Sequence, residues 1–259
     1  MKFSIKKITE VKKEEIYSRE LMIPKSQLAE QAVINGYNFK KAIFDKKKTN
    51  IIAELKKASP SAGIIRENFN PGEIALNYQK NGASAVSVLT DEKFFMGKLD
   101  YLSEVRSSIK LPILRKDFIV SEYQILEASV FGASAVLLIT SLLDDVQLSD
   151  FREICSEFNL APLFEIHNEA ELERAQKAGA DIIGINNRNL SDPALKTDLS
   201  VCFSLAPKIP KETLVIAESG IKSAEDIKKL KSAGVNAFLA GEALMRAPDP
   251  GKKLKELLI

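Results

Sequence analysis

The chain has 259 residues, of which 45% are hydrophobic, and 37 basic against 35 acidic residues give a formal net charge of +2. These values are typical of a globular protein and exclude the disordered, collagen-like and disulfide-rich classes. Because the charges nearly balance, we expect neither nucleic acid nor an anionic membrane as a partner.

The cysteines and the N-terminal segment bear on the compartment. Cys155 and Cys202 stand far apart, with no neighbouring Cys or His at metal-ligand spacing, so we expect buried, reduced thiols and no metal site. The segment MKFSIKKITEVKKEE is too charged for a signal peptide, and no apolar run approaches the roughly 20 residues of a membrane span. We therefore expect a cytoplasmic protein without a membrane anchor.

The first elements expected along the chain are helices within residues 1–49. Apolar positions there have helical spacing, namely Ile8, Val11, Ile16 and Leu21. The pattern predicts a helical extension ahead of the first strand.

Short apolar runs follow, each continuous and rich in β-branched residues. Such runs are typical of strands buried on both faces, which favours a parallel sheet. The predicted strands are Ile51–Leu55, Ala85–Thr90, Pro112–Asp117, Ala135–Thr140, Pro162–Ile166, Ile182–Asn186, Leu214–Glu218 and Ala237–Gly241.

Helices are expected between the strands. Segments resembling Gly-Ala-Ser-Ala-Val recur at Gly82, Gly132, Gly179 and Gly234, where a glycine suits the left-handed residue that ends a helix. Helix starts are indicated by capping residues, namely Asn70 before Pro71, Ser121, Asn168, Ser223, and Asp249 before Pro250.

Strict alternation of strands and helices without a linker predicts the α/β class and a single (β/α)₈ barrel, the TIM-barrel fold. An open, doubly wound sheet is the alternative, because strand number alone does not prove closure. Residues 50–259 would form the barrel and residues 1–49 its helical extension, in one domain. The extension could cover the bottom of the barrel or reach its active site.

Polar side chains occur near the ends of several predicted strands. In a barrel these ends meet at one face, where active sites lie. Because a buried charge is costly unless it is paired or used, a converging set favours an active site over a structural salt-bridge layer. The residues are Glu54, Lys56, Lys116, Glu165, Asn186, Arg188, Glu218 and Ser219.

Glycines after the last two strands indicate a phosphate site. Ser219-Gly220 and Gly241 stand where barrels often bind phosphate through backbone amides. Lys56 and Ser59 could add a charge and a hydroxyl group. Ordinary turn glycines are the alternative interpretation.

The single histidine, His167, follows the fifth predicted strand. Because lysines and glutamates already end the strands, we interpret His167 as a bystander or supporting group rather than as the proton carrier. The sequence contains no Ser-His-Asp arrangement, metal-binding cluster or Gly-rich dinucleotide motif.

Seven ordered motifs resemble the indole-3-glycerol phosphate synthase family over nearly the whole chain. They are IIAELKKASPSAG from Ile51, VSVLTDEKFFMG from Val86, LPILRKDFIV from Leu111, PLFEIH from Pro162, GINNRNL from Gly184, AESGI from Ala217 and FLAGEALMRAPDP from Phe238.

The resemblance implies a carbon–carbon lyase of tryptophan biosynthesis that uses no cofactor or metal. Its substrate would be 1-(2-carboxyphenylamino)-1-deoxyribulose 5-phosphate, which closes to an indole with loss of carbon dioxide and water. The resemblance further implies Lys116 as general acid and Glu165 as general base. Glu54 and Lys56 match a pair that contacts substrate and has also been given acid and base roles. Oligomeric state stays open between monomer and weak homodimer, with a tryptophan-pathway enzyme as a candidate partner.

The remaining roles also come from the resemblance. The family's polar ring is matched by Asn186, Arg188, Glu218 and Ser219. Its phosphate contacts are matched by Ser59, Gly220 and Gly241. The positions that sandwich the aromatic ring are matched by Phe95, Phe118 and Leu137. Glu242 stands where some relatives have a small hydroxyl residue, so phosphate binding there would depend on backbone amides. An aromatic contact from the extension would have to come from Phe3 or Tyr17.

Two further expectations concern the pKa values of the site lysines and the alternative functions. Burial and the mutual repulsion of Lys56 and Lys116 would lower a lysine pKa toward the working pH, while nearby glutamates would oppose that shift. One rival is a sister barrel such as phosphoribosylanthranilate isomerase, which the Lys116 and Glu165 motifs disfavour. The other is a barrel that binds a phosphorylated metabolite without turnover.

Overall fold

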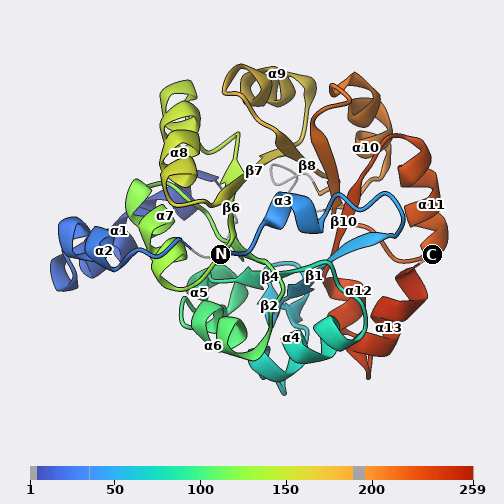
Figure 1. Cartoon of the computed structure of the whole chain (residues 1–259), viewed down its shortest axis with the longest axis horizontal. Helices are drawn as coiled ribbons and strands as arrows, with labels where there is room; N and C mark the ends of the chain where they lie inside the picture. The colour runs from blue at the N-terminus through green and yellow to red at the C-terminus, as the bar shows by residue number, and fades with distance from the viewer. Residues whose placement is uncertain (1–4, 35, 189–195, 259) are drawn as a thin grey trace.

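The computed structural model describes residues 5–34, 36–188 and 196–258. Within these ranges, eight parallel strands close into a barrel in the order β1-β10-β9-β8-β7-β6-β5-β4. Helices surround the barrel on its outer side (Figure 1). The closed order confirms the predicted (β/α)₈ barrel and excludes the open sheet.

The barrel strands agree with the predicted runs to within one residue at each end. They are β1 Asn50–Leu55, β4 Ala85–Leu89, β5 Ile113–Lys116, β6 Ala135–Ile139, β7 Ala161–Ile166, β8 Ile182–Asn186, β9 Leu214–Glu218 and β10 Ala237–Ala240. The predictions that ended at Thr90, Asp117, Thr140 and Gly241 each ran one residue past the C-terminal end of the strand, because these residues begin the loops. A small antiparallel hairpin after β1, formed by β2 Ala58–Ser59 and β3 Gly63–Ile64, was not predicted.

The expected helix boundaries are also present. Side chains of Asn70, Ser121, Asn168, Ser223 and Asp249 each accept a hydrogen bond from a backbone N–H of the helix that follows. The joint glycines Gly82, Gly132, Gly179 and Gly234 have φ of 94°, 86°, 79° and 101°. The helices after β1 are α4 Pro71–Lys80, α5 Glu92–Phe95, α6 Tyr101–Ser108, α7 Glu122–Val130, α8 Asp145–Glu157, α9 Glu169–Lys177, α10 Ser200–Leu205, the 3₁₀ turn Ala206–Lys208, α11 Ala224–Ser232, α12 Glu242–Met245 and α13 Pro250–Leu257.

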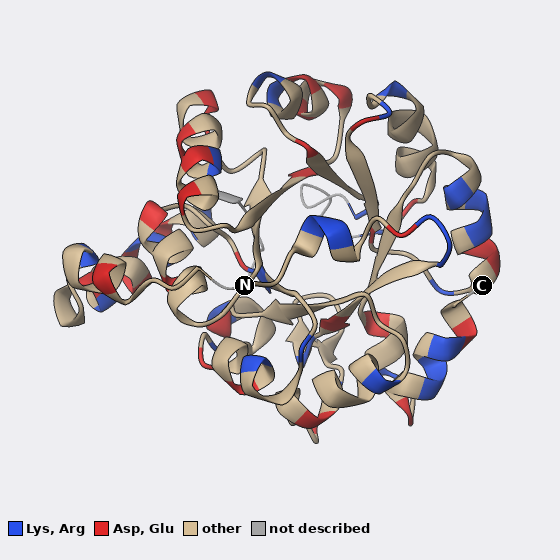
Figure 2. Ribbon diagram, in the orientation of Figure 1, with Lys and Arg blue, Asp and Glu red and all other residues tan. Residues whose placement is uncertain are grey.

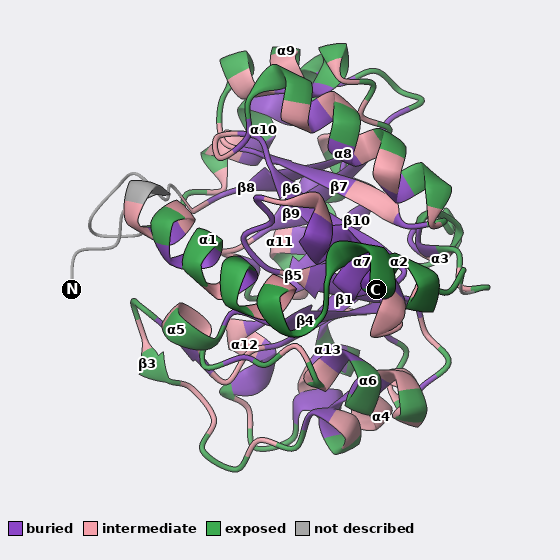
Figure 3. Ribbon diagram, turned by 90° about the vertical axis from the view of Figure 1, so that its left-hand side faces the viewer, coloured by how far each residue is buried: buried purple, intermediate pink, exposed green. Residues whose placement is uncertain are grey.

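Buried apolar side chains lie on both faces of the strands, as parallel strands covered on both faces require. One apolar cluster fills the space between strands and outer helices, and a second fills the barrel interior. Figure 3 shows the buried strands enclosed by helices whose outer surfaces are exposed. Basic and acidic residues both occur on these outer helices (Figure 2), which matches the balanced composition. No helix in the described ranges is long and apolar enough to cross a membrane.

The predicted helical extension consists of α1 Ile5–Met22, α2 Lys25–Gln31 and α3 Phe39–Ala42. Ile8, Val11 and Ile16 are buried. Leu21, which belongs to the same helical spacing, is 69% exposed. The end of α1 and α2 project beyond the barrel in Figure 1, which leaves this side chain without a barrel surface to cover.

The extension reaches both ends of the barrel. Helix α3 lies over the barrel centre in Figure 1, and its Phe39 is 1% exposed within the interior cluster. Lys40 Nζ is 2.6 Å from Asp181 Oδ2, immediately before β8, which places α3 at the bottom. Helix α1, in contrast, contacts the loops at the opposite end through Lys12.

Candidate active site

A cavity of about 440 Å³ opens where the barrel strands end. All of the predicted site residues except Ser59 line it. They are Glu54, Lys56, Phe95, Lys116, Phe118, Leu137, Glu165, Asn186, Arg188, Glu218, Ser219, Gly220, Gly241 and Glu242.

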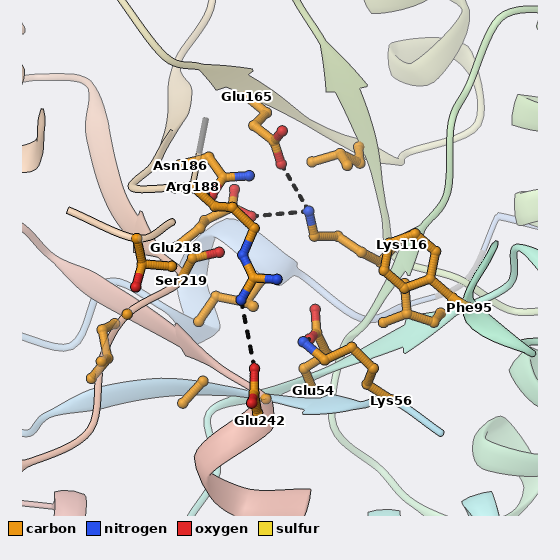
Figure 4. A pocket seen from close by; sticks show the side chains of 18 of the residues that line it. Glu54, Lys56, Phe95, Lys116, Glu165, Asn186, Arg188, Glu218, Ser219 and Glu242 are labelled. Atoms are coloured by element: carbon orange, nitrogen blue, oxygen red, sulfur yellow. Dashed lines mark hydrogen bonds and ion pairs between the residues drawn. The ribbon is translucent and has the colours of Figure 1, made fainter. Parts of the chain in front are cut away.

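Lys116 stands at the centre of the charged part of this cavity (Figure 4). Its Nζ lies 2.8 Å from Glu165 Oε2 and 3.1 Å from Glu218 Oε2, and both glutamate side chains are 1% exposed. Strands β5, β7 and β9 supply these three residues, which alternation along each strand directs toward the barrel axis. On β1, Lys56 Nζ pairs with Glu54 Oε1 at 2.7 Å. The predicted convergence of ammonium and carboxylate groups is therefore present.

The pKa of Lys116 is raised, contrary to the shift that lysine repulsion alone would give. Burial acts to lower this pKa, but the carboxylates of Glu165, Glu218 and Glu54 outweigh it. Lys116 is therefore a stable ammonium group whose charge the surrounding glutamates neutralise. The nearby glutamates were expected to oppose a downward shift of the lysine pKa. They outweigh the effect of burial, so the net shift of the Lys116 pKa is upward.

The two glutamates that contact Lys116 have opposite pKa shifts. Burial acts to raise the pKa of Glu165, but Lys116 and His167 bring it below its usual value. Burial, together with the charge of Glu165, raises the pKa of Glu218 to about 7 despite its pairing with Lys116. Near neutral pH, one carboxylate is thus ionised while the other readily exchanges a proton.

His167 supports Glu165 rather than lining the cavity. Its Nε2 is 3.6 Å from Glu165 Oε1, and its Nδ1 is 3.1 Å from Glu171 Oε2. Burial acts to lower the pKa of His167, yet hydrogen bonding to Glu171 and the charge of Glu165 raise it. This position fits the interpretation of His167 as a supporting group.

One side of the cavity is suited to an anion. After β9, Ser219 and Gly220 have φ of 65° and 81°, so successive residues are left-handed and form a tight turn. After β10, a Cβ on Gly241 would lie 2.2 Å from Glu54 Oε1, so a larger residue there would displace the Glu54 carboxylate. Backbone amides can approach a ligand closely at such turns.

Cationic side chains surround this side. Lys56 and Arg188 were predicted; Lys222 and Arg246 also line the cavity and follow β9 and β10. Glu242 lies among them, with its Oε1 2.9 Å from Arg246 Nε and its Oε2 3.6 Å from Arg188 Nη2. The surplus of cations provides the charge that a phosphate group would need.

The other side of the cavity is apolar. Phe95, Phe118 and Leu137 line it as expected, together with Leu89 and Ile139. The ring centroids of Phe95 and Phe118 are 6.1 Å apart. Figure 4 shows Phe95 on the side opposite Ser219, with Lys116 reaching in between.

Two of the expected contacts, Ser59 and Tyr17, do not line the cavity. Ser59 is buried in the β2 hairpin, where its Oγ accepts a hydrogen bond from Ala62 N at 3.2 Å and stabilises the turn. Tyr17 is 64% exposed and does not line the cavity. Phe3 lies outside the described residues.

The sequence interpretation missed two buried aspartates that line the cavity, Asp91 and Asp117. Asp91 directly follows the predicted strand Ala85–Thr90, and Asp117 is the last residue of the predicted strand Pro112–Asp117, so their positions could have identified them. In the part of the chain that the structure describes, no group of three or more His, Cys, Asp or Glu residues could hold a metal ion.

A closed (β/α)₈ barrel with paired acid and base groups at its strand ends is a TIM-barrel enzyme. The family model described as indole-3-glycerol phosphate synthase matches residues 5–257. A protein of that name from Campylobacter jejuni subsp. doylei is 49% identical over 257 residues, covering 97% of this chain and 98% of the relative. One from Legionella pneumophila strain Paris is 46% identical over 254 residues, covering 98% of each. The chain belongs to the indole-3-glycerol phosphate synthase family.

Solved structures of low sequence identity share the fold. A 3-hexulose-6-phosphate synthase structure superimposes with a TM-score of 0.64 at 18% identity, covering 81% of this chain and 98% of the other. An N-acetylmannosamine-6-phosphate 2-epimerase from Clostridium perfringens gives 0.62 at 15% identity, covering 81% and 91%. These matches concern the barrel alone.

Proposed function

We propose that this chain converts 1-(2-carboxyphenylamino)-1-deoxyribulose 5-phosphate to indole-3-glycerol phosphate, carbon dioxide and water, as a carboxy-lyase of tryptophan biosynthesis. One observation carries the proposal. Lys116 stands between Glu165 and Glu218 in a cavity with a left-handed turn and cationic side chains on one side and phenylalanine rings on the other. This arrangement matches a substrate with a phosphate at one end and an aromatic ring at the other.

Binding at both ends would bring the reacting carbons together, which is a large part of the catalytic effect. The bond forms between the ring carbon that carries the carboxylate and the ketone carbon of the sugar. As it forms, the ketone oxygen takes a proton from the Lys116 ammonium, and the carboxylate leaves as carbon dioxide. The raised pKa of Lys116 keeps the donor protonated until this more basic oxygen develops beside it.

Dehydration completes the indole ring. The new hydroxyl leaves as water when protonated, and a carbon-bound proton beside the ring nitrogen is lost to a base. Glu165 is that base in our proposal, because its pKa is held below its usual value and it is ionised at neutral pH. Lys56 with Glu54 forms a second acid and base pair at 2.7 Å, which could protonate the leaving hydroxyl.

Substitution of Lys116 by alanine tests these roles. We expect Lys116→Ala to lower kcat by about 10²- to 10⁴-fold, the usual contribution of a general acid. Affinity for sn-glycerol 3-phosphate, which occupies the phosphate end alone, should stay within about twofold. Equal losses of turnover and phosphate affinity would instead assign Lys116 to binding.

We also propose a cytoplasmic enzyme that is a monomer or weak homodimer, with another tryptophan-pathway enzyme as a candidate partner. Cys155 and Cys202 are free, buried thiols, which supports a reducing compartment. Sedimentation at increasing protein concentration, with and without a purified pathway enzyme, would test the assembly.

A further inference from the structure

Helix α1 places a buried ammonium group against the cavity wall. Lys12 is 1% exposed, although it belongs to a helix outside the barrel. Its Nζ is 2.6 Å from Asp91 Oδ2 and 3.0 Å from Asp117 Oδ1. Both aspartates line the cavity, so only their side chains separate Lys12 from the space where substrate would bind.

Asp91 connects Lys12 to one phenylalanine of the apolar side. It caps the short helix α5, and its Oδ1 accepts hydrogen bonds from Phe94 N at 2.6 Å and Phe95 N at 3.2 Å. The other carboxylate oxygen faces Lys12. The position of the Phe95 backbone therefore depends on a carboxylate that Lys12 holds from the opposite side.

Asp117 makes the equivalent connection to the second phenylalanine. It follows Lys116, and its Oδ1 accepts a hydrogen bond from Phe118 N at 2.8 Å. The same oxygen lies 3.0 Å from Lys12 Nζ. One ammonium group thus joins two carboxylates from the loops that follow the neighbouring strands β4 and β5, and each carboxylate accepts a hydrogen bond from the backbone of a ring on the cavity wall.

The electrostatics require such a cation. Arg115 Nη2 lies 3.2 Å from Asp117 Oδ2, but Lys12 is the only basic side chain paired with Asp91 within the described residues. Burial acts to lower the pKa of Lys12, and the two aspartates raise it above its usual range. Without Lys12, two buried carboxylates would repel each other across the base of the ring-binding wall.

We propose that Lys12 is a positioning residue for the aromatic end of the substrate. By drawing Asp91 and Asp117 together, it sets the spacing of Phe95 and Phe118. This inference rests on the proposed function, because it takes the anthranilate ring to lie between those rings. It also gives helix α1 a role in substrate recognition that needs no direct contact with the ligand.

The test compares Lys12→Met with Lys13→Met, a substitution at an exposed lysine of the same helix. We expect Lys12→Met to weaken binding of indole-3-glycerol phosphate about tenfold and to lower kcat/KM by about 10- to 100-fold. Binding of sn-glycerol 3-phosphate, which lacks the ring, should change less than about twofold. Lys13→Met should resemble the unsubstituted chain in all three.

A purely structural role would lower the folded fraction while leaving both dissociation constants of the folded protein unchanged, and that result would overturn the inference.

Asp91→Asn, which keeps an oxygen to cap α5, covers the case in which Lys12→Met does not fold. Weaker binding of the ring-bearing ligand alone supports the inference, and unchanged binding refutes it. If the double variant folds, its loss should be smaller than the two single losses combined. If the unsubstituted chain binds both ligands but forms no indole, the proposed function is contradicted. The role of Lys12 is then still decided by the dissociation constants of the two ligands for Lys12→Met and the unsubstituted chain.

Discussion

Replacement of Lys116 by methionine should destabilise the fold in a pH-dependent way. Methionine keeps much of the volume but removes the charge between Glu165 and Glu218. At an effective dielectric constant of about 20, Coulomb attraction is about 6 kcal/mol at the 2.8 Å separation and about 5 kcal/mol at the 3.1 Å separation. Desolvation of the ions offsets part of this attraction. Removing one partner of a buried pair typically costs about 3 to 5 kcal/mol, which is the loss we expect at about pH 8.

The sign of the pH dependence follows from the glutamates that remain. Burial without a neighbouring ammonium would raise the pKa of both Glu165 and Glu218 in the folded variant above their values in the unfolded chain. The folded variant would then bind more protons than its unfolded state, so its stability falls as pH rises. The difference from the unsubstituted chain should therefore shrink to about half or less near pH 5, where the glutamates are protonated.

Urea unfolding at both pH values measures this difference. Lys229→Met is the control, because Lys229 is 62% exposed and lies 3.6 Å from Glu225, a pair whose loss should change stability by less than about 0.5 kcal/mol. If Lys116→Met were as stable as the unsubstituted chain at about pH 8, the buried carboxylates could not be clustered around Lys116.

Three further substitutions probe other contacts. His167→Gln removes a positive neighbour of Glu165, so the pKa of that carboxyl group should rise. With Glu165 as the proposed base, the acidic limb of the kcat profile should move to higher pH, and an unmoved limb would contradict the contact. Gly184→Ala would place a Cβ 2.1 Å from Glu218 Oε1, so the flexible carboxylate should shift and turnover should fall about 10²-fold with little change in melting temperature. Arg115→Met removes a cation that is 1% exposed and should cost about 3 to 5 kcal/mol in urea unfolding; a loss below about 1 kcal/mol would refute its pairing.

The barrel could be predicted because its strands are buried on both faces. Continuous apolar runs, the capping residues and the left-handed glycines all gave the same boundaries, so independent local signals agreed. The β2 hairpin could not be found in this way, since strands of two residues carry no periodic pattern. Leu21 fitted a helical repeat, but the repeat does not specify how far along α1 the barrel surface extends.

The site was predictable as a set of residues but not as an electrostatic system. Alternation directs Lys116, Glu165 and Glu218 toward one axis, so their meeting follows once closure is assumed. Which charge dominates depends on separations of a few ångströms between strands that are distant in sequence. The direction of the Lys116 pKa shift is therefore determined by the folded arrangement of these strands.

The position of Lys12 in the sequence indicates that this lysine is buried. It lies four residues from both Ile8 and Ile16, so it occupies the buried stripe of α1. A lysine within such a stripe predicts a buried partner. The identity of that partner, Asp91 with Asp117, depends on two loops that only the folded barrel brings together.

In the proposed reaction, this cavity couples ring closure to decarboxylation. The most direct measurement follows indole fluorescence and released carbon dioxide together while the purified chain consumes 1-(2-carboxyphenylamino)-1-deoxyribulose 5-phosphate. We expect equal molar amounts of the two products, formed at a rate proportional to enzyme concentration. Consumption of substrate to an isomer without carbon dioxide, or no consumption at all, would contradict it.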